Sequence, residues 1–418
     1  MTATLLWQPS LPDRYHQLSP HDLAAAIADR RQRLGRKLVI LGHHYQVDEV
    51  VRHADITGDS LKLSQQAAEL AKAGEVDTVV FCGVHFMAET ADMLTPESVD
   101  VILPDLSAGC SMADMADYED TVEAWELIHA SLEQRGWRGR VIPITYVNST
   151  AAIKAFVGAH GGACCTSSNA DRVFEWAMRG GDKPLEDGEG VKILFLPDQH
   201  LGRNTAHKHG IDVANRSAVY DPKRTQRGEP LGGMTDEQLH NADAILWAGH
   251  CSVHKLFRPE HCDEIRMENK TLEADGETPT TILVHPECAK EVVDKADLAG
   301  STEYIIQQIE SAQPGSRWAI GTEVHLVNRL AARAAERDVR VRILSDCQCL
   351  CTTMYRIDEP HLLWVLDQRC GIDPNTGEER GEAHAKAINV VRVHPEVRAS
   401  AVDALDRMLA LAGAPALD

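Results

Sequence analysis

Short apolar runs alternate along the chain with longer segments in which apolar residues recur at helical spacing. The first runs, at 37–41, 77–83 and 101–103, are rich in Val, Ile and Leu and have the length of buried strands. Helices are predicted at 19–34, which starts with Ser-Pro, and at 61–73. This alternation of strand and helix is typical of βαβ units and predicts a parallel sheet.

The same alternation starts again twice. Further strands are predicted at 140–146, 192–196 and 242–247, and then at 280–284, 317–321 and 339–344. An amphipathic helix is expected at 397–411. A chain of 418 residues exceeds one small core, and the pattern predicts an α/β protein of three consecutive units. No repeat in the sequence is strong enough to prove a duplication.

A cysteine follows one strand in each unit. The stretches 101–115, 245–254 and 341–354 each contain an apolar run, a turn, a thiol and a predicted helix start. Backbone N–H groups and the helix dipole favour a thiolate at such a position. We expect the three places to meet in space. Three thiolates without a fourth protein ligand suit an iron–sulfur cluster with one open iron. Zinc held by C-Q-C-L-C and a histidine is the alternative.

Polar side chains also gather just after strand ends, where ligands bind in open parallel sheets. They are His43, Tyr45, Ser60, Tyr146, Asn148, His285, Glu287, Ser301 and Thr302. A single loop histidine or tyrosine is usually an ordinary cap, but nine at equivalent positions favour a binding site.

The net charge, the apolar runs and the number of cysteines limit the functions that the chain can have. The net charge of -21 argues against a nucleic-acid partner but leaves room for an anionic substrate in a local pocket. No apolar run approaches the roughly 20 residues needed to span a membrane, and the N-terminus does not resemble a signal peptide. We therefore expect a cytoplasmic protein. An odd count of eleven cysteines fits reduced thiols better than disulfides.

A series of motifs resembles the quinolinate synthase family over roughly residues 37–411. The motifs are GHHYQ, GDSLKLS, CGVHFMAETADML, PDLSAGCSMADM, TYVNS, CTSSNA, LPDQHLGRN, GHCSVH, VHPEC, AGSTEYII, IGTE and CTTM, in this order. FMAET, AGCSMA, YVNS and HPEC in succession are highly specific.

The resemblance implies three similar three-layer αβα domains with parallel sheets around a pseudo-threefold axis, with the active site at the centre. The implied domains are 1–136 with Cys110, joined by the C-terminal helices 372–418, then 137–266 with Cys251, and 267–371 with Cys351. The resemblance also implies one 4Fe–4S cluster per chain on these three cysteines, with the fourth iron open to substrate. Cys351 is favoured over its two neighbouring cysteines because the x-x-Met spacing follows it.

The family condenses iminoaspartate with dihydroxyacetone phosphate to quinolinate in de novo NAD biosynthesis, releasing phosphate and water. The reaction is of transferase or lyase type. Because iminoaspartate has to be supplied, the resemblance also implies a functional link to an L-aspartate oxidase. Tyr45, Glu287, His285 and Tyr146 are suited to move protons. The open iron can act as a Lewis acid. The substrate-binding residues are expected to be His43, Ser60, Tyr146, Asn148, Ser167, His285, Glu287, Ser301 and Thr302.

Two other classes are considered: a zinc-dependent hydrolase with Cys and His ligands, and a non-enzymatic iron–sulfur sensor. His44 is left out of the site because the family often has Tyr there. Cys347 and Cys349 could pair with Cys351 in a redox disulfide or replace it as a ligand. Residues 158–190 are longer than in short family members and are interpreted as a surface insertion.

Overall fold

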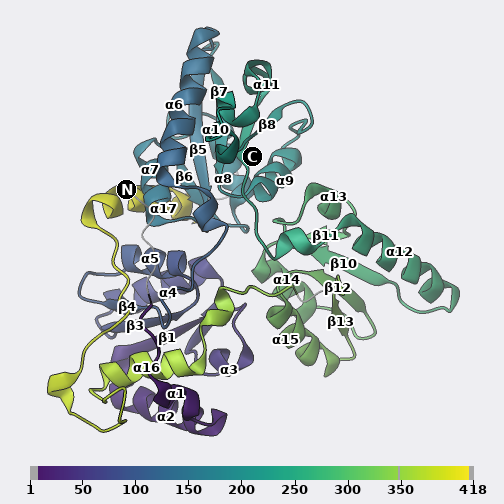
Figure 1. The fold of residues 1–418 in the computed structure, drawn as a ribbon. Coiled ribbons are helices and arrows are strands. Elements are labelled where there is room, and N and C mark those ends of the chain that lie inside the picture. The colour runs from purple at the N-terminus through teal and green to yellow at the C-terminus, as the bar shows by residue number, and fades with distance from the viewer. Residues whose placement is uncertain (1–7, 347–348, 414–418) are drawn as a thin grey trace. The chain divides into compact units, whose positions relative to one another are not determined.

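The structure is a computed structural model that describes residues 8–346 and 349–413 (Figure 1). The described residues form two compact units. One unit holds 8–110 and 351–394, and the other holds 111–346, 349–350 and 395–413. Three parallel sheets, each flanked by helices, confirm the predicted α/β class. Within the described residues, no helix combines the length and the apolar character that crossing a membrane requires.

The first unit is built on a four-stranded parallel sheet in the order β2-β1-β3-β4. Helices α4 and α5 lie on one face, and α2 and α16 lie on the other (Figure 1). The strands are β1 (Leu38–His43), β2 (Ile56–Gly58), β3 (Thr78–Cys82) and β4 (Asp100–Ile102). The helices are α1 (Asp13–Gln17), α2 (Pro20–Leu34), η1 (Gly35–Lys37), α3 (Asp48–Val51), α4 (Ser60–Lys72), α5 (His85–Leu94), η5 (Met354–Arg356), α16 (Glu359–Arg369) and η6 (Glu382–His384).

A buried carboxylate fixes α16 to the first helices of this unit. Asp367 of α16 is fully buried and accepts hydrogen bonds from Arg14 Nη1 at 2.9 Å, Arg30 Nε at 2.9 Å and the Tyr15 hydroxyl at 3.0 Å. Residues 351–394 therefore fold with the first sheet. The domain boundaries 1–136, 137–266 and 267–371 stay a prediction.

The second unit begins with a five-stranded parallel sheet in the order β6-β5-β7-β9-β8. Its strands are β5 (Gly139–Tyr146), β6 (Ala163–Cys165), β7 (Gly190–Leu196), β8 (Ser217–Tyr220) and β9 (Ala244–Trp247). Its helices are η2 (Ala113–Met115), α6 (Tyr118–Gln134), α7 (Ala151–Ala159), α8 (Ala170–Met178), α9 (Gln199–Lys208), α10 (Pro222–Thr225), η3 (Pro230–Gly233), α11 (Asp236–Asn241), η4 (His254–Leu256) and α17 (Pro395–Gly413).

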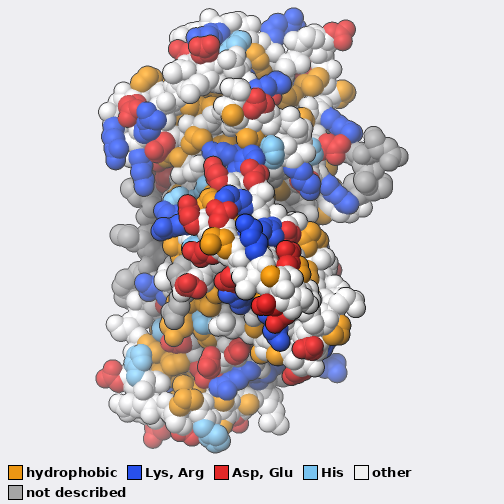
Figure 2. Space-filling model, turned by 90° about the vertical axis from the view of Figure 1, so that its right-hand side faces the viewer, with side chains coloured by type: hydrophobic (Ala, Val, Ile, Leu, Met, Phe, Trp, Pro, Cys, Tyr) orange, Lys and Arg blue, Asp and Glu red, His pale blue; other side chains and the backbone are white. Residues whose placement is uncertain are grey.

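The third sheet, in the same unit, has the order β11-β10-β12-β13 and is also parallel. Its strands are β10 (Thr280–Val284), β11 (Leu298–Ala299), β12 (Arg317–Gly321) and β13 (Arg340–Ile343). Its helices are α12 (Pro259–Ala274), α13 (Lys290–Val293), α14 (Thr302–Glu310) and α15 (Val324–Ala335). On the face drawn in Figure 2, acidic and basic side chains are interspersed.

The third sheet repeats the first in topology and in detail, at a spacing of 242 positions. Asp55 Oδ2 accepts a hydrogen bond from Ile40 N at 2.7 Å, and Asp297 Oδ2 accepts one from Ile282 N at 2.7 Å. The same spacing relates His43 to His285, Tyr45 to Glu287, Val50-Val51 to Val292-Val293, Gly58 to Gly300 and Ser60 to Thr302. The predicted site residues of these two segments therefore occupy equivalent places after equivalent strands.

Helix α17 crosses α7 at very close range. A Cβ atom on Gly158 of α7 would lie 1.8 Å from the carbonyl oxygen of Ser400 in α17. The two backbones can approach this closely only because residue 158 has no side chain. The C-terminal helix predicted at 397–411 thus packs on α7, β6 and α8.

Replacing Gly158 with alanine is expected to force α17 away from α7. Overpacking of this kind costs about 1–3 kcal/mol. Urea unfolding should show a lower midpoint, and hydrogen exchange should be faster in α17. Gly413→Ala in the same helix meets no atom within 4 Å and is the matched control. Equal stability of the two variants would contradict the close packing.

Candidate active site

The structure distributes the predicted site residues over both units. The first-sheet unit holds His43, Tyr45, Ser60, Cys110 and Cys351. The other unit holds Tyr146, Asn148, Ser167, Cys251, His285, Glu287, Ser301 and Thr302. The set as a whole stays a prediction, but several members of each group are brought together within their own unit.

In the first-sheet unit, His43 ends β1 and turns back on Tyr45. His43 Nδ1 accepts a hydrogen bond from Tyr45 N at 3.1 Å, and the two rings lie edge to face with centroids 4.8 Å apart. Ser60 is the first residue of α4, directly after the capping Asp59. His43 and Ser60 are buried, whereas Tyr45 is half-buried. His43 is thus the last residue of β1, and Ser60 lies two residues after β2.

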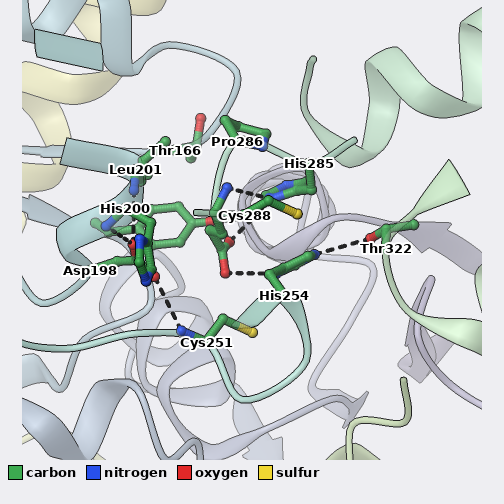
Figure 3. A network of polar contacts seen from close by, with 12 residues as sticks. Thr166, Asp198, His200, Leu201, Cys251, His254, His285, Pro286, Cys288 and Thr322 are labelled. Carbon is green, nitrogen blue, oxygen red and sulfur yellow. Dashed lines mark hydrogen bonds and ion pairs between the residues drawn. The ribbon is translucent and has the colours of Figure 1, made fainter. Parts of the chain in front are cut away.

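In the other unit, Glu287 is the centre of a buried hydrogen-bond network, of which Figure 3 labels His254 and Thr322. The Tyr146 hydroxyl, at the end of β5, donates to Glu287 Oε1 at 2.7 Å. Glu287 Oε2 lies 3.0 Å from His254 Nδ1, and His254 Nε2 lies 3.2 Å from Thr322 Oγ1. Two sheets thus contribute side chains to one chain of polar contacts.

The charges in this network follow from burial and from its neighbours. Burial alone would raise the pKa of Glu287, but His254, His285 and the hydrogen bonds from His254 and Tyr146 outweigh it and lower the pKa to about 2. Burial, with His254 close by, lowers the pKa of His285 to about 3. Glu287 is therefore a carboxylate at neutral pH, and His285 is a neutral imidazole.

The negative charge of Glu287 determines the direction of its hydrogen bond with His254. A carboxylate can only accept, so His254 Nδ1 donates to Glu287. His254 Nε2 lies at hydrogen-bond distance from the Thr322 hydroxyl, which can donate or accept. This is a carboxylate that orients a histidine toward a hydroxyl, the arrangement in which histidine acts as a general base.

Sequence reasoning missed His254 and Thr322. Both lie within motifs that it had singled out, GHCSVH and IGTE, but nothing in the sequence placed them beside Glu287. The signal available was the Cys-x-x-His spacing, which puts His254 on the 3-10 helix directly after the thiol of Cys251. His254 is 1 % exposed, which a loop cap would not be.

A second carboxylate, Asp198, is fully buried next to this network. Burial raises the pKa of Asp198 well above its usual range, and the nearby Glu287 raises it further, against three backbone hydrogen bonds that lower it. Asp198 follows β7 and caps α9. Three backbone N–H groups, of His200, Leu201 and Cys251, donate to its two oxygens.

The three sequence-predicted ligand thiols have the same local structure. A 3-10 helix begins three residues after each cysteine, η2 after Cys110, η4 after Cys251 and η5 after Cys351. The carbonyls of Cys251 and Cys351 accept hydrogen bonds from the amides four residues on, at 3.2 and 3.1 Å. The expected helix start is thus a single 3-10 turn, and it is repeated three times.

Exposure separates these thiols from most of the others. Cys110, Cys251 and Cys351 are half-buried, whereas Cys82, Cys164, Cys165, Cys262, Cys288 and Cys349 are buried. Burial raises the pKa of Cys82 and of Cys164 to about 12, so these thiols keep their protons. Cys347 lies outside the described residues. Cys370 is half-buried as well, but burial raises the pKa of its thiol to about 11. Cys110, Cys251 and Cys351, which combine partial exposure with the shared turn, are therefore the better metal ligands.

Further contacts relate these thiols to the rest of the site. Within the first-sheet unit, Arg356 Nη1 donates to Ser107 Oγ at 3.0 Å, which joins the segment before Cys110 to the turn after Cys351. In the other unit, the ligand atoms of Cys251, His254 and Glu287 lie within 4.8 Å of one another. This set of one thiolate, one imidazole and one carboxylate can hold a metal ion.

The remaining predicted residues occupy loop positions of the second unit. Asn148 follows β5 and Ser167 follows β6, and both are half-buried. A hydrogen bond of 2.8 Å from Val147 N to Cys165 O joins their two segments. Ser301 caps α14 by accepting from Tyr304 N at 3.3 Å, and Thr302 is the first residue of that helix.

The three parallel sheets define the chain as an α/β protein, and the buried Tyr146–Glu287–His254 network is typical of an enzyme active site. A family model described as quinolinate synthetase A protein matches residues 25–410, and the chain belongs to this family.

Curated relatives of this length are named quinolinate synthase. The one from Acidobacterium capsulatum is 49% identical over 402 residues, covering 96% of each chain. The one from Streptomyces coelicolor is 46% identical over 394 residues, or 94% of this chain and 89% of the relative. The one from Halalkalibacterium halodurans is 50% identical over 365 residues, or 87% of this chain and 90% of the relative.

Proposed function

We propose that this chain has quinolinate synthase activity and condenses iminoaspartate with dihydroxyacetone phosphate in NAD biosynthesis. The products are quinolinate, phosphate and water, and the atoms balance without any oxidant. The observation that carries the proposal is the buried Glu287 carboxylate between the Tyr146 hydroxyl and His254, in a chain of this family.

The substrates are a dicarboxylate and a phosphate ester, and both require hydrogen-bond donors. Ser60 and Thr302 are the first residues of α4 and α14, where backbone N–H groups and the helix dipole favour an anion. Together with Ser301, His43, Asn148 and Ser167 they form the proposed binding set, supported by their positions after strand ends. His285, neutral and buried, can donate or accept without adding charge.

Tautomerisation and dehydration both require protons to move. Glu287 touches a donor hydroxyl through Oε1 and an imidazole through Oε2, so it can pass a proton between Tyr146 and His254. Its low pKa keeps it a carboxylate between turnovers. Tyr45, at the equivalent position in the first-sheet unit, is the further proposed proton donor.

We propose that Cys110, Cys251 and Cys351 hold one 4Fe–4S cluster, supported by their shared turn and their exposure. When bound, a cluster with one iron free of protein ligands supplies Lewis-acid chemistry toward a substrate hydroxyl or carboxylate. No electron has to be transferred in the overall reaction.

Iminoaspartate hydrolyses in water, so an L-aspartate oxidase is the proposed partner that supplies it. A cytoplasmic location is proposed as well. It is supported by six cysteines that are free thiols, which a reducing compartment maintains. They are Cys82, Cys164, Cys165, Cys262, Cys288 and Cys370.

Anaerobic purification tests the proposal. We expect a brown protein with about four irons per chain that forms quinolinate from the two substrates. A colourless protein with stoichiometric zinc would favour the Cys and His zinc hydrolase. A protein loaded with cluster that forms no quinolinate would favour the sensor.

A further inference from the structure

Helix α9 is hydrogen-bonded to the loop that carries Glu287. The side-chain amide of Asn204, in the second turn of α9, donates one hydrogen bond to Pro286 O at 2.8 Å and another to Cys288 O at 2.9 Å. These two carbonyls stand on either side of Glu287 in the chain. Both amide protons of Asn204 are therefore used on the loop of a different sheet.

The start of the same helix holds the loop of Cys251. Asp198 caps α9 by accepting at Oδ1 from His200 N at 2.7 Å and Leu201 N at 2.8 Å (Figure 3). Its other oxygen, Oδ2, accepts from Cys251 N at 3.2 Å. Capping the helix requires only Oδ1, so the bond to Cys251 is additional to the capping function.

Backbone contacts make this second attachment rigid. Asp198 and Gly249 form a parallel bridge, and Gln199 N donates to Gly249 O at 3.0 Å. A Cβ atom on Gly249 would lie 2.0 Å from the carbonyl oxygen of Pro197, so the two loops are in direct backbone contact. The segment before Cys251 is therefore fixed to the start of α9 by both backbone and side chain.

We propose that α9 positions the reactive centre, with Asn204 as the positioning residue for Glu287 and Asp198 as the positioning residue for Cys251. The two attachments sit on one ten-residue helix, so the helix sets the placement of the carboxylate relative to the thiol. The inference rests on the proposed function, because that function gives Glu287 and Cys251 their roles. It assigns a purpose to the LPDQHLGRN motif (196–204), which the proposed chemistry does not use directly.

Asn204→Ala tests the first attachment. Loss of both bonds should lower kcat about 10- to 100-fold, as a misplacement of about 1 Å does, with a much smaller change in KM and unchanged iron content. In a Glu287→Gln background the same change should cost nothing more, because Asn204 acts only through Glu287. His207→Ala, on the exposed side of α9, is the control.

Two results would overturn this assignment: an unchanged kcat for Asn204→Ala, or the same fold loss in both backgrounds. Hydrogen exchange of residues 285–288 gives a readout without turnover. It should be faster in Asn204→Ala than in the parent protein and in His207→Ala, whether or not the chain makes quinolinate. Equal exchange rates in the parent protein, Asn204→Ala and His207→Ala would refute the attachment of Asn204 to this loop, whatever the function of the chain.

Asp198→Asn tests the second attachment. An amide can still cap α9 through its oxygen, but its NH₂ group then faces the donor N–H of Cys251. Iron should be released to a chelator several-fold faster than from the parent protein, measured as bleaching of the visible band. Asp117→Asn is the control, because Asp117 caps α6 through the same pair of backbone bonds. Equal bleaching rates for the two variants would overturn the role of Asp198.

Discussion

Replacing Cys110 or Cys251 with alanine is expected to abolish both bound iron and quinolinate formation. In the proposed cluster three thiolates hold four irons, so the loss of any one of them should prevent assembly. Both cysteines lie in half-buried turns of the same type, so their replacement removes few packing contacts. Iron analysis, visible absorbance and a quinolinate assay measure the effect, with circular dichroism to verify folding.

Cys165→Ala is the matched control for these variants. Cys165 is fully buried in β6, and burial raises the pKa of its thiol well above the usual range. Its loss should reduce stability but leave the iron content unchanged. Among Cys347, Cys349 and Cys351, alanine at Cys351 should have the largest effect. Iron loss in Cys165→Ala with retention in Cys251→Ala would contradict the ligand assignment.

Glu287→Gln is expected to keep the cluster and to lower kcat by about 10²–10⁴-fold, the range of general acid–base catalysis. The amide oxygen can still accept from the Tyr146 hydroxyl. Its NH₂ group, however, would face His254 Nδ1, which donates to the carboxylate in the parent protein. Neither a proton relay nor the orientation of the imidazole survives this change.

The measurement is steady-state turnover together with iron content. Glu291→Gln, an exposed carboxylate in α13, is the control and should have parental activity. Parental turnover of Glu287→Gln would remove Glu287 from the mechanism.

The sequence was sufficient to predict every central strand but only two of the six edge strands, β4 and β13. All nine predicted strands are present, and 280–284 is reproduced to the residue as β10. Four short strands were missed: β2, β6, β8 and β11. They have two to four residues and lie at or next to sheet edges, so their apolar runs are too short to show a period.

The internal repeat was also missed, for a physical reason. The Asp55 and Asp297 side chains make the same backbone hydrogen bond, and Val50 and Val292 are buried at equivalent positions, but most other positions of the two segments differ. The two segments share the geometry of a turn. A comparison of their sequences reveals this shared geometry only weakly. Tyr45 and Glu287 show how different chemistry can occupy one position of a shared scaffold.

The candidate site was predictable only in part. Strand-end position identified Tyr146 and Glu287 separately, and their hydrogen bond follows from the fold. His254 and Thr322 could not be placed, because contacts between residues 33 and 68 positions apart depend on how two sheets pack. The Asn204 side chain likewise donates to Pro286 O and Cys288 O, which are more than 80 positions away in the sequence.

An anomalous map at the iron edge, from crystals of the anaerobically purified protein, tests the central claim most directly. We predict one four-iron cluster bonded to Cys110, Cys251 and Cys351, with a fourth iron that has no protein ligand. A single metal ion held by Cys251, His254 and Glu287, or a cluster on any other set of thiols, would contradict the account.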